Sequence, residues 1–88
     1  MSKRTVYVLH VDDAALDARD STSAYEATPD GLLSAKIAAQ AYHTDRRVDQ
    51  QVEPFQLSWR MDEDRGHHVA DDVALSIDFT IALLEVGA

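Results

Sequence analysis

The densest group of chemically capable side chains lies at residues 62–72, in the stretch DEDRGHHVADD. Five carboxylates and two adjacent histidines occur within these eleven residues. Such side chains can hold a metal ion, exchange protons in acid–base catalysis, or present negative charge to a partner. The same residue types are also common in solvated turns. Spacing and context decide among these four interpretations.

Metal binding is not favoured by the spacing. Asp62 and Asp64 match the first two ligands of a calcium loop, but Gly66 falls at the fifth position instead of the sixth, and valine stands where glutamate is needed. His67 and His68 are adjacent, and on an extended chain they point to opposite faces, so they do not readily share one zinc ion. We therefore predict no metal and no cofactor. A metal-dependent hydrolase centred on the two histidines remains an alternative.

No catalytic motif accompanies these residues. The three glycines, Gly31, Gly66 and Gly87, stand apart, so the chain has no glycine-rich phosphate loop. Neither the G-x-S-x-G nor the H-E-x-x-H pattern of hydrolases occurs. The absence of cysteine excludes a thiolate nucleophile, a thiolate metal site and a disulfide. We therefore expect a protein that is not an enzyme and has no catalytic residues.

Charge is the strongest feature of the composition. Sixteen acidic residues face eight basic ones, which gives a formal net charge of -8. Such a surface repels nucleic acid and anionic lipid and attracts basic proteins. We therefore expect no direct binding to nucleic acid or membranes, and a partner that is a protein or ribonucleoprotein with a basic surface.

Nine of the acidic residues form two groups along the chain. They are Asp12, Asp13, Asp17 and Asp20, followed by Asp62, Glu63, Asp64, Asp71 and Asp72. These nine residues are the predicted partner-binding residues. The alternative is that the carboxylates only keep a small protein soluble.

The elements that position these groups begin with a strand. The stretch Arg4 to Val11 is rich in β-branched and aromatic residues. Its apolar residues occupy both odd and even positions, so both faces of a strand here would be at least partly covered, which predicts a central strand. Residues 12–23 fit either a turn of helix from Ala14 to Arg19 or an irregular acidic loop. Residues 23–27 are compatible with a short second strand.

A helix follows, with Thr28 as its N-cap and Pro29 at its first position. Leu33, Ile37 and Ala41 recur at helical spacing, so we expect this stripe to pack on the sheet.

Two long alternating stretches complete the chain. Residues 53–62 and 71–86 show period-2 alternation, and the turn chemistry at 62–66 predicts an antiparallel hairpin between them. The predicted fold is therefore α+β: an antiparallel sheet of three or four strands with one helix on one face, in the order β-(β)-α-β-β, as a single domain over residues 1–88.

This arrangement predicts the core and the places of the acidic groups. The side chains expected between helix and sheet are Leu33, Ile37, Leu57, Trp59, Ile77, Phe79 and Ile81. If residues 23–27 form a strand, the two acidic groups should fall at opposite ends of the sheet; if they do not, the groups should meet. The alternation in these residues favours the strand, and therefore two separate acidic patches.

Targeting signals are not predicted. The N-terminal apolar run is short, alternates as a strand does and lacks a small-residue cleavage site, so we do not expect a secretory signal. No apolar run approaches the roughly 20 residues of a membrane span. We expect a cytoplasmic protein.

The passage YEATPDGLLSAKIAAQ and the aromatic, aliphatic ending DFTIALLEVGA are similar in character to those of small phage-encoded anti-CRISPR proteins. The resemblance extends over most of the chain in size, acidity and element order. It implies a stoichiometric inhibitor in the host bacterial cytoplasm that docks on a CRISPR effector complex, often on the basic surface that holds its nucleic acid. The resemblance assigns no residue roles.

An interaction module of another class is the main alternative. A small antitoxin or a phage assembly factor would bind through an exposed sheet edge or an apolar face. Salt distinguishes the two, because charge-driven docking weakens with ionic strength whereas apolar docking does not.

Overall fold

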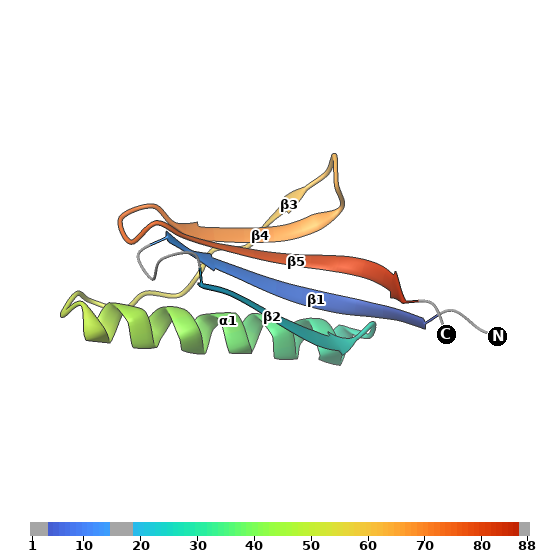
Figure 1. Cartoon of the computed structure of the whole chain (residues 1–88), viewed down its shortest axis with the longest axis horizontal. Helices are drawn as coiled ribbons and strands as arrows, with labels where there is room; N and C mark the ends of the chain where they lie inside the picture. Colours follow the sequence, from blue (N-terminus) through green and yellow to red (C-terminus); the bar gives the residue numbers. More distant parts are fainter. Residues whose placement is uncertain (1–3, 15–18, 87–88) are drawn as a thin grey trace.

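The computed structural model describes residues 4–14 and 19–86, which form one α-helix and five β-strands (Figure 1). In chain order these are β1 (Arg4–Asp13), β2 (Arg19–Glu26), α1 (Pro29–Asp49), β3 (Arg60–Asp62), β4 (His67–Asp72) and β5 (Ile77–Val86). The predicted α+β class is confirmed, with five strands instead of three or four. The uncertain second strand is present and is longer than expected.

The strands form one sheet in the order β2-β1-β5-β4-β3, and every neighbouring pair is antiparallel. Strands β1 and β5 form its centre, where Leu9 lies opposite Ile81 and Val11 opposite Phe79. Helix α1 runs along one side of the sheet, next to β2 and β1 (Figure 1). We call this side the inner face and the other side the open face. Because side chains alternate along a strand, neighbouring residues point to different faces.

The core lies between α1 and the inner face. Its buried apolar side chains are Leu9, Val11, Ala35, Ala39, Leu57, Ala70, Ile77, Phe79 and Ile81. Among the residues predicted to be buried, Leu57, Ile77, Phe79 and Ile81 are confirmed, and Trp59 is partly buried.

The start of α1 agrees with the sequence. The hydroxyl oxygen of Thr28 accepts a hydrogen bond from the amide of Gly31 at 3.0 Å, and Pro29 is the first helical residue. Capping of this kind satisfies an amide that has no partner within the helix. No helix of the described residues combines the length and the apolar character needed to cross a membrane.

The face that α1 turns to the sheet differs from the prediction. Leu33 and Ile37 are 56% and 60% exposed, so their predicted burial is wrong. The buried positions in the first half of the helix are instead Gly31, Ala35 and Ala39. These small residues let the helix approach the sheet closely, and they leave little space for larger aliphatic side chains on that side.

The stretch predicted as a strand at 53–62 is also different, since only its last three residues pair as β3. Residues 51–59 cross the inner face without ladder hydrogen bonds. The side-chain amide of Gln40 holds them, because Nε2 donates to the carbonyl of Phe55 at 2.9 Å and Oε1 accepts from the amide of Leu57 at 2.7 Å. This anchor on α1 explains how Leu57 reaches the core without belonging to a strand.

The predicted strand at 71–86 is divided by a turn at 73–76. Ser76 adopts a positive φ of 56°, and its amide donates to the carbonyl of Val73 at 3.2 Å. The stretch DEDRGHHVADD therefore comprises the last residue of β3, the turn at 63–66 and all of strand β4. Its interpretation as a solvated, charged hairpin is wrong at Ala70 and Asp72, which are buried on the inner face.

Candidate partner-binding surface

Asp13 is enclosed at the end of β1, where it meets two side chains of α1. Its Oδ2 accepts hydrogen bonds from the hydroxyl of Tyr42 and from Nε of Arg46, each at 2.7 Å. Asp13 has no exposed surface, so this predicted partner-binding residue lies inside the protein.

The phenol of Tyr42 and the guanidinium of Arg46 are both affected by this carboxylate. Burial, together with the hydrogen bond to Asp13, raises the pKa of Tyr42 from 10.0 to about 12. The hydrogen bond to Asp13 also raises the pKa of Arg46, although burial acts in the opposite direction. This cluster joins β1 to the last turns of α1 through charge and hydrogen bonding.

Asp72 forms a second buried cluster at the end of β4. Its Oδ2 lies 2.7 Å from Nε2 of His43 and accepts from Nε of Arg47 at 2.9 Å. Its Oδ1 accepts from the amide of Leu75 at 3.2 Å, which fixes the turn that follows. Burial alone would raise the pKa of Asp72, but these hydrogen bonds outweigh it and lower the pKa.

The His43–Asp72 pair has the groups of an acid–base couple and is buried. His43 is fully buried, and its Nδ1 has no hydrogen-bond partner among the described residues. The cavity of about 350 Å³ at this end of the molecule is lined by Ala14, Arg46, Gln50, Ala74, Leu75 and Ser76. Neither His43 nor Asp72 is among the described residues that line it, and the pair joins α1 to the end of β4.

The open face carries a different set of carboxylates at the same end of the sheet. Asp12 on β1 lies opposite Asp78 on β5, and Asp78 lies opposite Asp71 on β4. We call these three residues the acidic row. Asp12 and Asp78 are exposed, whereas Asp71 is half-buried and is 3.3 Å from Nη1 of Arg60.

No family model matches this chain, and no curated protein or solved structure shows significant similarity to it. The function is therefore inferred from the surface itself.

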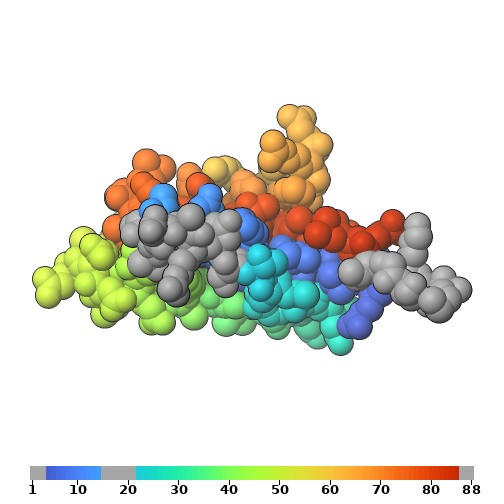
Figure 2. Space-filling view, viewed as in Figure 1, coloured from blue at the N-terminus to red at the C-terminus, as the bar shows by residue number. Residues whose placement is uncertain are grey.

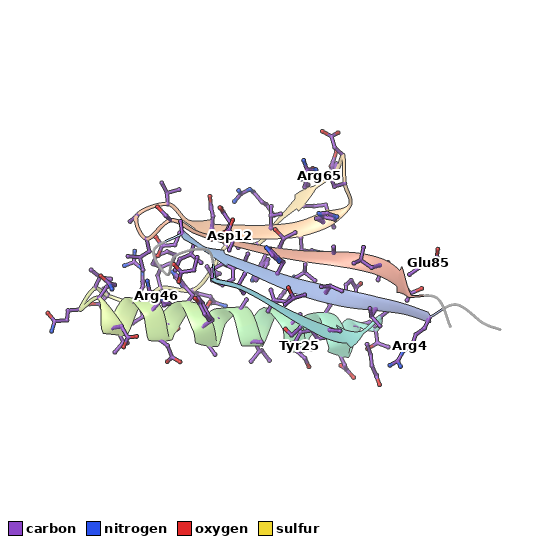
Figure 3. The ribbon with its side chains drawn as sticks, viewed as in Figure 1. Arg4, Asp12, Tyr25, Arg46, Arg65 and Glu85 are labelled. Atoms are coloured by element: carbon purple, nitrogen blue, oxygen red, sulfur yellow. The ribbon has the colours of Figure 1, made fainter. Side chains whose placement is uncertain are left out.

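The remaining predicted residues lie in several places. In β2 the backbone of Asp20 lies opposite Asp12, and Asp17 lies outside the described residues. Glu63 and Asp64 are exposed in the β3–β4 turn, and Asp62 is half-buried beside it. This turn also holds Arg65, and Figure 3 shows Arg65 far from Asp12.

The expected separation of the two acidic groups is therefore only partly right. Strand β4 leads from the 63–66 turn back to the acidic row, so Asp71 lies at the end of the sheet that carries Asp12. Only the acids of the turn lie apart from that end. The prediction failed for Asp71 because it placed this residue at the start of the strand 71–86, next to the 62–66 turn, whereas residues 67–72 form a separate strand that leads away from that turn.

Asp78 is the residue that the sequence analysis missed. The alternation of the strand could have indicated it, because Asp78 lies between the inward-pointing Ile77 and Phe79 and must therefore point to the opposite face. The pairing register that sets it beside Asp12 is not visible in one sequence.

In the part of the chain that the structure describes, no group of three or more histidine, aspartate or glutamate side chains could hold a metal ion.

Proposed function

We propose that the protein is a small, non-enzymatic binding protein that docks its acidic row on a basic surface of a larger protein or ribonucleoprotein. The row itself carries the proposal. Asp12 and Asp71 both lie directly opposite Asp78, and like charges directly opposite each other in a sheet are destabilising. A cationic partner would relieve this repulsion. The acidic row therefore costs folding stability and favours binding to a basic surface.

The finer form of the proposal is an anti-CRISPR-like inhibitor that acts in a bacterial cytoplasm. The small size, the net charge of -8 and the α+β fold support it. In this form the acidic row occupies the basic groove in which a defence complex holds its guide or target nucleic acid. Inhibition would then be stoichiometric and would compete with nucleic acid.

The test begins with capture of a partner from bacterial lysate, followed by affinity measurements on the identified complex. The double variant Asp12→Asn/Asp78→Asn should lower the affinity about tenfold or more, because removing charges that face a cationic surface costs at least 1.4 kcal/mol in sum. The matched control Glu63→Gln/Asp64→Asn removes the same charge from the β3–β4 turn and should have a smaller effect. Equal affinities for the parent and the Asp12→Asn/Asp78→Asn variant would refute the proposal.

For the finer form, purified CRISPR effector complexes are assayed for cleavage of target DNA with increasing amounts of the protein. Cleavage should stop near equimolar protein, and excess target DNA added first should protect the complex. If no effector type is inhibited, the anti-CRISPR form is wrong while the broader binding proposal stands.

An interaction module that binds through an apolar face is the second candidate. Leu33, Ile37 and Val48 on the outer side of α1 are each more than half exposed. Beside them, a groove of about 210 Å³ is lined by Leu33, Lys36, Ile37, Gln40, Gln56, Leu57 and Trp59. Exposed apolar surface of this kind often marks a protein contact. Under this candidate, Leu33→Gln/Ile37→Gln abolishes partner binding and added salt leaves it unchanged.

A further inference from the structure

The open face beyond the acidic row is mostly apolar along the two central strands. Three pairs of residues occupy it, Val6 opposite Leu84, Val8 opposite Ala82 and His10 opposite Thr80. Helix α1 lies on the inner face, and Figure 2 shows β1 and β5 (blue and red) reaching the surface between α1 and the β3–β4 hairpin. No described element covers these residues.

Along β1 and β5, the charged residues of this surface lie at its two ends. On the open face of β1, Arg4 stands at one end and Asp12 at the other, and Figure 3 shows them far apart along the sheet. The open-face residues of β1 and β5 between them carry no carboxylate or ammonium group. On the flanking strands, Glu26 of β2 lies opposite Val6, and Arg60 of β3 lies opposite Val69 of β4. From Val6 to Asp12 the strand rises roughly 20 Å, at about 3.3 Å per residue. Along β1 and β5 the open face is therefore an apolar strip, with Arg4 and the flanking Glu26 at one end and the three carboxylates of the acidic row at the other.

We propose that this strip receives an amphipathic α-helix of the basic partner, which lies along β1 and β5 with its N-terminal end over the acidic row. This inference rests on the proposed function and identifies the element that the partner presents. A helix of about 14 residues has the matching length of roughly 20 Å. Its apolar side covers Val8 and Ala82, and the complex then has helices on both faces of the sheet.

Charge complementarity sets the direction of this helix. The N-terminus of a helix carries partial positive charge and the C-terminus partial negative charge. The N-terminal turn, with added lysine or arginine, therefore fits over Asp12 and Asp78, and the C-terminal turn fits at the other end, where Arg4 offsets the carboxylate of Glu26. A second copy of α1 suits the strip poorly, because its first turn carries Asp30.

The experiment uses the isotope-labelled full chain and two synthetic helical peptides of about 14 residues with leucine at helical spacing. One peptide carries two lysines in its first turn, and the other carries the same lysines in its last turn. The first should shift the amide resonances of Val8, Thr80 and Ala82 and bind about tenfold more tightly than the second. Shifts centred on α1, equal affinities, or no binding of either peptide would overturn the inference.

A pair of variants separates this inference from the proposed function. Val8→Gln/Ala82→Gln changes the apolar strip and keeps the acidic row, and Leu33→Gln/Ile37→Gln makes the matched change on α1. The strip variant should lose about tenfold in affinity for the captured partner while the α1 variant keeps it, with melting curves confirming that both fold. If only the acidic-row variant weakens binding, the helix inference fails and the proposed function stands. If neither the row nor the strip matters, both fail.

Discussion

Adjacent aspartates have different roles at two places in the sheet. Asp13 and Asp72 point to the inner face, where arginines of α1 neutralise them. Their neighbours Asp12 and Asp71 point to the open face. Removing one partner of a buried ion pair leaves an uncompensated charge, whereas removing an exposed carboxylate does not. The same amino acid therefore stabilises the fold at one position and is available to a partner at the next.

Repulsion within the acidic row gives the first prediction. Asp78 lies between Asp12 and Asp71, so Asp78→Asn should stabilise the protein by about 0.5 kcal/mol. In a domain of this size the melting temperature should rise by about 2–4 °C. Thermal unfolding followed by circular dichroism measures the change, and Asp64→Asn in the exposed turn is the control, which should leave the melting temperature nearly unchanged. A lower melting temperature for Asp78→Asn would show that the carboxylate stabilises the fold.

The phenol of Tyr42 gives a prediction at high pH. Its pKa is about 12 in the folded protein and 10.0 ordinarily, so the unfolded chain loses this proton first as the pH rises. The stabilisation is complete below pH 10 and is lost as the pH approaches 12. Tyr42→Phe should remove this part of the decline in the free energy of unfolding.

Urea unfolding from about pH 9 to pH 12 measures that decline. Tyr25→Phe is the control, because it keeps Tyr42 and should decline as the parent does. If Tyr42→Phe and the parent lose stability in parallel over this range, the hydrogen bond to Asp13 does not hold the phenol proton.

Small residues let helix α1 approach the sheet, and the aliphatic residues Leu33, Ile37 and Val48 point outward. Gly31 shows how close the approach is, since a Cβ there would overlap the carbonyl oxygen of Glu26. Gly31→Ala should therefore destabilise the protein by about 1–3 kcal/mol, although alanine is ordinarily the better helix former.

The melting temperature again measures the effect, with Ser34→Ala as the control on the exposed side of α1. Ser34→Ala should be neutral or slightly stabilising, because only helix propensity changes there. A stabilised Gly31→Ala variant would mean that the first turn of α1 lies farther from the end of β2 than the structure places it.

The elements that the sequence predicted well are those with local signals. Capping by Thr28 and the alternation around Phe79 depend only on neighbours in the chain, and both are confirmed. The side of α1 that packs depends on the whole inner face, where Gln40 binds the 51–59 segment and Leu57 supplies apolar volume that Leu33 was expected to supply. Helical periodicity identified the aliphatic stripe of Leu33 and Ile37, but it did not show whether this stripe faces the sheet or the solvent.

The candidate surface was predictable only in part, for a similar reason. Parity along β1 groups Asp13 with the buried Leu9 and Val11, so a stricter use of alternation would have separated it from Asp12. The acidic row needs the register of three strands as well. That register depends on the turn at 73–76, where Ser76 has a positive φ without glycine, and apolar alternation continues through the turn.

At the scale of the whole molecule, negative charge is concentrated unevenly on an elongated body. The principal extents are 49 × 24 × 23 Å, and the acidic row occupies one end of the sheet. A net charge of -8 repels itself within so small a protein, and the row adds repulsion between direct neighbours. Partner binding and folding should therefore respond to salt in opposite directions.

The last prediction compares these two responses. Raising sodium chloride from about 0.1 M to about 1 M shortens the screening length from about 10 Å to about 3 Å. The melting temperature of the free protein should rise as its repulsion is screened, while affinity for the basic partner should fall. Asp12→Asn/Asp78→Asn should flatten both trends, and Glu63→Gln/Asp64→Asn, which removes equal charge from the turn, should flatten them less. Affinity that holds or increases with salt would show that the contact is apolar, and the exposed stripe on α1 would then be the better candidate surface.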